Sequence, residues 1–272
     1  MRDSSIITPI QHTHAPALEV QAVSAGYVGN VSAIENVTFT VQKGERVAII
    51  GANGAGKSTL FKAMVGLIPF TQGHISIFGE DCRTSHNLVG YVPQYEAIDW
   101  SFPLTVFDVV MMGRTRQIGW FRAPSKHDRE RVQALLHTLG LSWLANRQIG
   151  ELSGGQKRRV FIARALAQET QVLLMDEPFN GVDSVAEQEI MAMLDILTAN
   201  GMTILLATHD LGKASRLFDR MLILNRRVVA FGTPQEVMQP SVLRQAYAGT
   251  VEVFMEDGQA YLLADEHGCG GG

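Results

Sequence analysis

The sequence has few cysteines and no long apolar run. Only Cys82 and Cys269 occur among its 272 residues, far apart in the chain. This pattern favours free thiols in a reducing cytosol over a disulfide framework. Apolar stretches such as Val47–Ile50 and Val172–Met175 are short, whereas a helix that crosses a bilayer needs about 20 apolar residues. If this protein takes part in a membrane process, another chain has to cross the membrane.

Positive charge is also scarce. The formal net charge is −4, and no dense run of lysine and arginine is present. A broad basic face for nucleic acid is therefore not expected, although this balance still permits local basic pockets for phosphates. Met1–Pro16 is polar and lacks the apolar segment of a secretory signal. Hydrophobic residues make up 46% of the chain, which suits one α/β domain with a small appendage.

The first part of the chain predicts strands around a glycine-rich turn. Leu18–Val23 and Ile34–Val41 alternate apolar and polar residues, as half-buried strands do. Arg46–Ile50 is a compact apolar run that ends at a glycine, and Lys57–Val65 has the pattern of a helix. A strand, a glycine loop and a helix in this order form the context that a phosphate-binding loop requires.

The middle of the chain changes to a helical pattern. Val106–Met112 and Asp128–Leu139 are predicted helices, and Gly113–Pro124 between them is a predicted loop. A further helix-like run, Lys157–Gln168, follows. We interpret this stretch as a helical subdomain, about residues 95–165, inserted between segments of a sheet.

The pattern of buried strands returns after this insertion. Val172–Met175 and Met202–Ala207 are short apolar runs, with a predicted helix at Val185–Ala199 between them. Strands that alternate with a helix in this way predict a parallel sheet. The main domain is expected to cover residues 17–240, preceded by a flexible arm, residues 1–16.

The C-terminal extension, residues 241–272, differs from the main domain. Val251–Glu256 and Gln259–Leu263 flank Asp257–Gly258, which is a strong signal for a two-residue hairpin turn. The final Gly268–Gly272 is glycine-rich, and we expect it to be disordered.

The segment Gly51-Ala-Asn-Gly-Ala-Gly-Lys-Ser58 matches the phosphate-loop pattern G-x-x-x-x-G-K-[ST]. Its glycines let the backbone wrap closely around phosphates, and the following helix adds its positive end. Lys57 can reach the β- and γ-phosphates, and the Ser58 hydroxyl can coordinate Mg²⁺. A simple glycine turn would not explain the lysine. The predicted nucleotide-binding residues of this segment are Gly51, Asn53, Gly54, Ala55, Gly56, Lys57, Ser58 and Thr59.

Two acids end the apolar run that starts at Val172. A buried strand delivers Asp176 to a Mg²⁺ position at the carboxyl edge of the sheet. Glu177, one residue later, can orient or deprotonate an attacking water. An apolar strand that ends in acids is common, so the value of this signal comes from its place downstream of the phosphate loop.

The most specific segment is Leu152-Ser-Gly-Gly-Gln156. A serine and two glycines before a helix expose N–H groups and a hydroxyl, which makes an anion site, although an ordinary helix cap has the same composition. Placed between the phosphate loop and the acidic strand, the segment resembles the signature of the ABC ATPases, and the resemblance spans roughly Leu18–Thr233. It implies a P-loop NTPase of the α/β class, with an antiparallel β subdomain, a parallel-sheet core and an inserted helical subdomain.

The resemblance also implies roles for residues that mean little alone. Tyr27 is similar to the aromatic residue that stacks on adenine, and Gln94, in Tyr91-Val-Pro-Gln94, to the residue that contacts Mg²⁺ and the attacking water. Asp183 is similar to the aspartate of the D-loop, and His209 to the switch histidine at the γ-phosphate. Taken singly, Tyr27 is a core aromatic, Gln94 a surface amide and His209 a histidine at a strand end. The implied catalytic set is Lys57, Gln94, Glu177 and His209, with ATP and Mg²⁺ as cofactors.

The family pattern further implies a head-to-tail dimer. Each ATP would lie between the phosphate loop of one copy and the signature of the other, contributed by Ser153, Gly154, Gly155 and Gln156.

The chain departs from the family pattern in the D-loop, where the sequence Phe179-Asn-Gly-Val-Asp183 replaces the commoner Ser-Ala-Leu-Asp. The aspartate is kept, so activity is expected, whereas the dimer contact made by Asn180–Val182 is expected to differ.

Two classes of function fit such an ATPase: a subunit that drives a membrane permease, or a soluble ATPase that acts on DNA or ribosomes. The second class usually has two modules or a long coiled-coil insertion, whereas this chain has one signature and no heptad tract. Transport is therefore favoured, with the chain at the cytoplasmic face of the membrane. The surface that receives the permease is predicted at Gln94–Arg116, with the aromatic and apolar residues of Tyr95–Leu104.

A narrower resemblance concerns the cargo. The stretch Asp99–Arg114, then Gly119–Trp120 and Arg147–Ser153, resembles the ATPase subunits of bacterial manganese, iron and zinc importers. Such systems pair the ATPase with an integral membrane permease and an extracytoplasmic metal-binding protein. Manganese or ferrous iron is favoured over zinc. Importers of iron chelates and cobalamin share much of the pattern and form the alternative.

Overall fold

The structure of the protein is a computed structural model that describes residues 15–27, 31–94, 103–119, 121–247, 251–256 and 259–264, the last two by backbone alone. Four of the sequence predictions lie outside these residues: the flexible arm up to residue 14, the permease-facing stretch 95–102, the hairpin turn Asp257–Gly258 and the glycine-rich tail.

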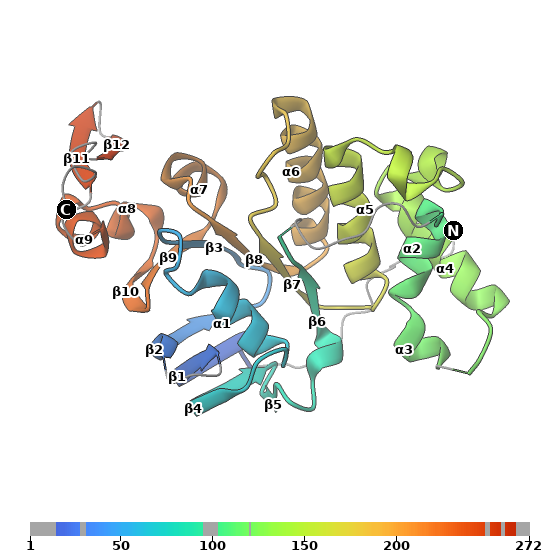
Figure 1. Ribbon diagram of the computed structural model, residues 1–272, viewed down its shortest axis with the longest axis horizontal. Coiled ribbons are helices and arrows are strands. Elements are labelled where there is room, and N and C mark those ends of the chain that lie inside the picture. Colours follow the sequence, from blue (N-terminus) through green and yellow to red (C-terminus); the bar gives the residue numbers. More distant parts are fainter. Residues whose placement is uncertain are drawn as a thin grey trace, which may run out of the picture.

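A six-stranded sheet forms the centre of the molecule (Figure 1). Its strand order is β10-β9-β3-β8-β7-β6, and every neighbouring pair is parallel except β10 and β9. The parallel pairing of β7 with β8 confirms the sheet predicted from the alternating pattern. The strands are β3 (Arg46–Ile50), β6 (Val89–Val92), β7 (Val172–Asp176), β8 (Thr203–Thr208), β9 (Arg220–Asn225) and β10 (Arg227–Gly232).

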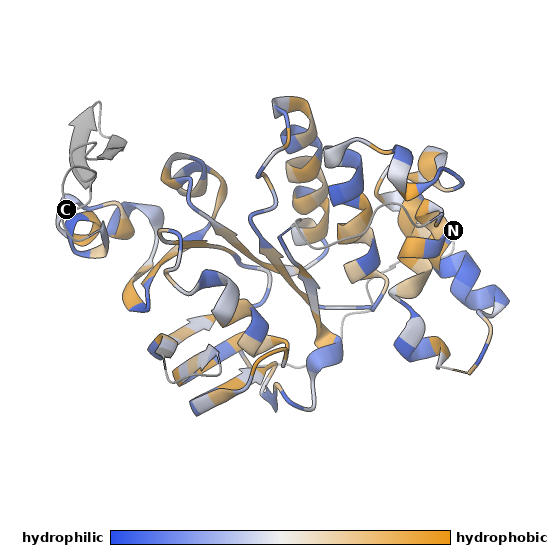
Figure 2. Cartoon of the chain, in the orientation of Figure 1, coloured by the Kyte–Doolittle hydropathy of each residue, from blue (hydrophilic) through white to orange (hydrophobic). Residues whose placement is uncertain are grey.

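The central strands are apolar on both faces because both faces are covered. In β3, Val47 and Ile49 enter one hydrophobic core, whereas Ala48 and Ile50 enter the other. Buried parallel strands read as continuous apolar runs for this reason. Figure 2 shows these strands as mostly hydrophobic.

A second, antiparallel sheet has the order β2-β1-β4-β5. Helix α1 (Lys57–Met64) contributes Leu60, Phe61 and Met64 to the hydrophobic core that these strands share with one face of the six-stranded sheet. The helix that follows the phosphate loop is therefore fixed by apolar packing. The strands are β1 (Leu18–Tyr27), β2 (Val31–Val41), β4 (Phe70–Ile77) and β5 (Glu80–Asp81).

Helices α2 (Val106–Met112), α4 (Lys126–Thr138) and α5 (Gly154–Leu166) gather at one end of the molecule (Figure 1). They agree with the predicted helical insertion, although α5 begins three residues before the expected start because Ser153 caps it. The prediction of a loop at Gly113–Pro124 was wrong in part.

That loop contains α3 (Thr115–Ile118), whose preceding residue is anchored in the interior. The guanidinium of Arg114 lies 2.9 Å from an Asp128 oxygen and 3.0 Å from a Glu169 oxygen, and Arg114 is only 5% exposed. Gly119, with a φ of 89°, ends the short helix. Tertiary anchoring, which no local pattern reveals, therefore orders this segment.

The remaining elements of the described chain are four helices, short 3-10 turns and a separate C-terminal pair of strands. β11 and β12 pair antiparallel, with Glu256 opposite Gln259, so the two strands of the predicted hairpin are confirmed. No helix within the described ranges is long and apolar enough to span a membrane. The elements are α6 (Ser184–Ala199), α7 (Leu211–Leu217), α8 (Pro234–Val237), α9 (Pro240–Tyr247), β11 (Val251–Glu256), β12 (Gln259–Ala264) and short 3-10 turns at His86–Leu88, Ser142–Leu144 and Ile149–Glu151.

Candidate functional site

The glycine loop between β3 and α1 is shaped by close packing. Gly56 has a φ of 99°, and a Cβ there would lie 2.4 Å from Ile34 Cγ2 and 2.8 Å from the carbonyl oxygen of Ala33. A Cβ on Gly51 would lie 2.3 Å from the carbonyl oxygen of Leu224. Both positions therefore require glycine, one for its conformation and contacts and one for its contacts alone.

Lys57 extends from the first turn of α1 back over the loop. Its Nζ donates to the carbonyl oxygen of Gly51 at 2.7 Å and to that of Ala52 at 3.3 Å. The same nitrogen lies 3.6 Å from Glu177 Oε1, and the side chain is only 7% exposed. The amine therefore stands between the loop and an acid of another strand.

The acids sit where β7 ends. Asp176 is the last residue of β7 and is 2% exposed; Glu177 follows it with a left-handed φ of 48°. The N–H of Glu177 donates to the carbonyl oxygen of Ala207 at 3.0 Å. This hydrogen bond to β8 stabilises a backbone conformation that a residue other than glycine rarely adopts.

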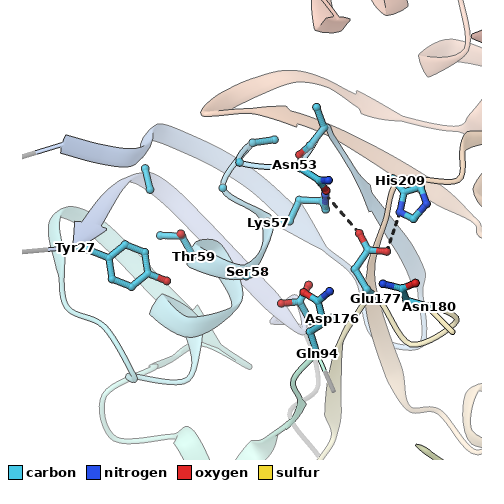
Figure 3. Close-up of a pocket in the computed structure, with 15 residues that line it drawn as sticks. Tyr27, Asn53, Lys57, Ser58, Thr59, Gln94, Asp176, Glu177, Asn180 and His209 are labelled. Atoms are coloured by element: carbon cyan, nitrogen blue, oxygen red, sulfur yellow. Dashed lines mark hydrogen bonds and ion pairs between the residues drawn. The ribbon is translucent and has the colours of Figure 1, made fainter. Parts of the chain in front are cut away.

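Glu177 also meets a histidine from the end of β8. Its Oε2 lies 3.1 Å from His209 Nδ1, while Oε1 faces Lys57 (Figure 3). The His209 side chain is 65% exposed and that of Glu177 is 10% exposed. One carboxylate thus lies between a buried amine and an imidazole at the surface.

One oxygen of the Asp176 carboxylate accepts no hydrogen bond from the described residues. Oδ2 lies 3.5 Å from the Tyr91 hydroxyl, whereas Oδ1 is buried without a hydrogen-bond partner among the described residues. Burial, with the nearby Asp176 charge as a second cause, raises the pKa of Tyr91, so the phenol stays a neutral donor. A buried, unpartnered carboxylate oxygen in a pocket that Ser58 also lines suits a hard cation such as Mg²⁺.

These groups line one pocket of about 560 Å³, within the range of ligand sites. In Figure 3 the acids and His209 lie at one end, with Tyr27 at the other. The lining residues are Tyr27, Ala33, Ala52, Asn53, Gly54, Ala55, Gly56, Lys57, Ser58, Thr59, Gln94, Asp176, Glu177, Asn180 and His209.

Nearly all of the predicted loop, acid and histidine residues therefore converge. Gly51 is not part of the lining; its carbonyl instead holds Lys57. Tyr27 forms the open end: it is 54% exposed, and its hydroxyl accepts a hydrogen bond from Lys62 Nζ at 3.2 Å. Lys62 Nζ also lies over the Tyr27 ring, 5.7 Å from its centroid, and the exposed ring can stack on a planar group.

The predicted signature residues lie outside this pocket. The Ser153 hydroxyl accepts from the N–H of Gln156, whose side chain accepts from the Ser153 N–H, so the segment forms a capping box at the start of α5. Ser153 and Gly154 are exposed. Asp183 is also outside, and its side chain accepts from the Ala186 N–H at 2.8 Å to cap α6.

Four residues at the site were not predicted as part of it: Ala33, Ala52, Tyr91 and Asn180. Asn180 lies three residues after Glu177, within the unusual D-loop wording, and that proximity was an available signal. Ala52 lies within the phosphate-loop motif, and Ala33 comes from β2. Tyr91 comes from β6, outside the lining, and meets the site through Asp176; it stands three residues before the predicted Gln94. Among the described residues, no group of three or more His, Cys, Asp or Glu is arranged to hold a metal ion.

The chain matches a protein-family model and is similar to several known transport proteins. A family model described as ABC transporter matches residues 34–180. The chain is 41% identical over 248 residues to the manganese transport system ATP-binding protein MntB of Halalkalibacterium halodurans, covering 91% of this chain and 98% of that protein. It is 44% identical over 216 residues to the zinc transport system ATP-binding protein TroB of Treponema pallidum, covering 79% and 81%.

Solved structures agree. An ABC transporter of metal-chelate type in an inward-facing conformation superposes with a TM-score of 0.76 at 28% identity, covering 91% of this chain and 96% of that one. The ADP conformation of an ATP-binding cassette of an ABC transporter gives a TM-score of 0.75 at 26% identity, covering 87% and 100%.

Proposed function

The chain belongs to the ABC transporter family as one of its ATPase subunits, and from this premise we propose that it hydrolyses Mg-ATP as one half of a head-to-tail dimer that drives a membrane permease. The observation that carries the proposal is the convergence of Lys57, Asp176, Glu177 and His209 on the single pocket lined by the phosphate loop.

We propose a role for each group at the reacting end. Lys57 neutralises charge on the β- and γ-phosphates, which the loop N–H groups also bind. Glu177 orients and deprotonates the attacking water, while His209, 3.1 Å from that carboxylate, contacts the γ-phosphate. Tyr27, at the other end, stacks on the adenine, and Asn53, Gly54, Ala55, Gly56 and Thr59 surround the phosphates.

Asp176, Ser58 and Gln94 are the residues that would hold Mg²⁺. Bound there, the ion neutralises charge that develops on the phosphate oxygens. The unpartnered Oδ1 of Asp176 supports this assignment, because a buried carboxylate oxygen without a donor is costly unless a cation or water meets it.

A dimer accounts for the residues that the pocket leaves out. Ser153, Gly154, Gly155 and Gln156 form a helix start at which Ser153 and Gly154 are exposed and Gly155 is buried, and a helix start is an anion-binding element. In a head-to-tail pair this start would meet the γ-phosphate held by the partner's phosphate loop, with Asp183 at the contact between copies. ATP then joins two surfaces, and hydrolysis removes that link.

For the cargo we propose divalent metal ions, with manganese and ferrous iron first. The relatives with manganese and zinc transport names support the class. The cargo need not contact this chain: an integral membrane permease would carry it, and an extracytoplasmic metal-binding protein would deliver it. The chain itself would lie peripherally at the cytoplasmic face of the membrane.

Import of iron chelates is a second candidate. The chain is 40% identical to the chelated iron transport system membrane protein YfeB of Yersinia pestis, and one superposed transporter is of metal-chelate type. Uptake of radioactive Mn²⁺, Fe²⁺ and Zn²⁺ by a deletion strain separates the candidates. Reduced uptake of Mn²⁺ or Fe²⁺ supports the first; unchanged uptake of all three, with growth on chelated iron lost, supports the second.

The permease-facing surface remains a proposal at Gln94–Arg116. Within it, Met112 is 45% exposed although it is a large apolar residue, and residues 95–102 lie outside the described part of the chain. Cysteine cross-linking from this stretch to a cytoplasmic loop of the permease tests it. Cross-links confined to the C-terminal hairpin would place the contact elsewhere.

The ATPase proposal is tested by two substitutions with different expected defects. Glu177→Gln should keep nucleotide binding and ATP-dependent dimerisation but lower hydrolysis by about 100-fold or more, because it removes the base alone. Lys57→Ala should weaken nucleotide binding itself. Gel filtration with ATP and a phosphate-release assay measure both effects.

Glu187→Gln is the matched control, because Glu187 is a carboxylate of α6 that pairs with Lys213 at 2.7 Å outside the pocket. It should hydrolyse ATP at the wild-type rate. A Glu177→Gln chain with unchanged hydrolysis would assign the base to another residue.

A further inference from the structure

Arg158 is a charged side chain in the interior that the proposed chemistry does not use. It lies on α5, is 2% exposed and is among the largest fully buried side chains of the described chain. Its Nη1 donates to the carbonyl oxygen of Pro93 at 3.4 Å, and its Nη2 donates to the carbonyl oxygen of Glu177 at 3.3 Å. Burying a guanidinium is costly, so its position calls for an explanation.

The two carbonyl groups that it binds belong to neighbouring strand ends. Pro93 directly follows β6, and Glu177 directly follows β7. These strands are parallel, with Val92 opposite Met175, so both carbonyls occur at one edge of the sheet. The planar fork of a guanidinium can bind two such acceptors at once, which the single ammonium of a lysine does with less geometric control.

Both carbonyls are coupled to the site through the backbone. Glu177 is itself the proposed base, and its backbone is held on one side by the N–H bond to Ala207. Its carbonyl oxygen accepts from Arg158 and also from the N–H of Asn180 at 3.2 Å. Pro93 precedes Gln94, which lines the pocket. Arg158 thus binds the backbone of Glu177, whose side chain lines the pocket, and the backbone of Pro93, whose neighbour Gln94 lines it.

The helix that carries Arg158 begins at the signature. Ser153 caps α5, and Arg158 lies five positions later, about 7.5 Å along the axis at 1.5 Å per residue. A hydrogen-bonded helix transmits a displacement over this distance as a nearly rigid rod. One helix therefore presents an anion site at its start and binds the catalytic strand ends one to two turns further on.

We propose that Arg158 is a positioning residue that sets Glu177 and Gln94 for hydrolysis and ties both to the signature end of α5. The inference rests on the proposed head-to-tail function. In such a dimer the start of α5 contacts the ATP bound by the partner, while Arg158 holds the base of its own site. Engagement of one ATP thereby aligns the base at the other.

The test compares Arg158→Lys and Arg158→Gln with wild type in the full chain. Each variant removes the guanidinium that binds the carbonyl groups of Pro93 and Glu177 together, but keeps a hydrogen-bond donor at this position. We expect kcat for ATP hydrolysis to fall about 10-fold or more, because the base is displaced, while the Kd for a fluorescent ATP analogue changes less than about 2-fold. A role in stability alone would not separate kcat from nucleotide affinity in this way.

Arg159→Lys is the matched control, because Arg159 is also buried on α5 but pairs with Glu189 at 2.9 Å, away from the strand ends. It should keep the wild-type kcat. Equal loss of kcat in the Arg158 and Arg159 variants, or a loss of nucleotide affinity and melting temperature that parallels the loss of kcat, overturns the positioning role.

A double-mutant cycle with Glu177→Gln completes the test. If Arg158 acts through Glu177, then Arg158→Lys should lower the residual single-turnover rate of Glu177→Gln by less than about 2-fold. A full additional 10-fold loss in that background overturns the inference. Failure of the proposed function is recognised separately, since wild type and the Arg159 control would then also lack hydrolysis.

Discussion

The phosphate loop and the signature segment are both glycine-rich starts of helices, yet they differ in what surrounds them. In the phosphate loop the amine is enclosed: Lys57 is 7% exposed and interacts with carbonyl groups and an acid of the same chain, although Ala52, Asn53 and Gly54 are exposed. At the signature start Ser153 and Gly154 are exposed, Gly155 is buried, and Ser153 and Gln156 bond to each other in a capping box. The difference fits the proposed dimer, in which one anion site is completed by this chain and the other contacts the nucleotide of the partner copy.

Breaking the enclosed site should have the largest effect on ATP turnover. Gly56→Ala places a Cβ 2.4 Å from Ile34 Cγ2 in a left-handed conformation. We expect the free energy of unfolding to fall by about 2–4 kcal/mol and nucleotide affinity to be lost with the loop geometry. Thermal unfolding and titration with a fluorescent ATP analogue measure both.

Gly54→Ala is the comparison variant for this loop. Its φ is 81°, but a Cβ there would meet nothing within 4 Å. Only backbone strain remains, so the expected loss is about 1 kcal/mol. Equal losses for the two alanine variants would mean that close packing at Gly56 does not shape the loop.

Breaking the exposed site should have an intermediate effect. Ser153→Ala removes a helix cap worth about 1 kcal/mol. Nucleotide affinity of the isolated chain should not change, because Ser153 does not line the pocket, whereas hydrolysis by the dimer should fall about 10-fold. Equilibrium titration and a phosphate-release assay separate the two quantities.

Ser125→Ala supplies the control, since Ser125 caps α4 with the same kind of capping box. It should lose about 1 kcal/mol of stability as well but hydrolyse ATP at the wild-type rate. If Ser125→Ala slows hydrolysis as much as Ser153→Ala, general loosening of the helices accounts for both.

The smallest effect on turnover is expected from the buried ion pair of the helical region. The hydrogen bond from the Ser125 side chain, and then the bond from Arg114, lower the pKa of Asp128 to about 2. This folded pKa lies below the ordinary aspartate pKa of 3.8, so the carboxylate stabilises the fold above about pH 4, and that contribution is lost as the pH falls towards 2.

Asp128→Asn should therefore reduce the free energy of unfolding by about 1–2 kcal/mol at pH 7, and by progressively less between pH 4 and 2. Nucleotide affinity at pH 7 should stay the same, because Asp128 does not line the pocket. Denaturant unfolding at a series of pH values provides the measurement. A stability difference that is constant across that range would assign the effect to packing.

The sequence predicts best where function constrains a local pattern. The phosphate loop, the two acids and the buried strands β3, β7 and β8 all follow from short stretches, because each stretch carries its own reason for its residue types. The strands β9 and β10 at one side of the sheet were not predicted, although Met221–Leu224 in β9 is an apolar run. The prediction that Gly113–Pro124 is a loop failed because the anchor of α3 is a distant ion pair.

Arg158 shows why the other residues around the site could not be predicted from the sequence. In the sequence it stands in the run Lys157-Arg158-Arg159, which has the look of a solvated face. Its burial depends on where two strand ends meet α5, which is a property of the assembled sheet. Tyr91 and Ala33 join the site for the same reason, each from a separate strand.

The packing of α1 has a consequence for the thermodynamics of nucleotide binding. Leu60, Phe61 and Met64 fix this helix in the core that the two sheets share, so the loop in front of it is already ordered before any ligand arrives. Binding to a preorganised site avoids the entropic cost of folding a segment. The heat-capacity change measured by calorimetry for a single chain should accordingly be small, reflecting the area of the nucleotide alone.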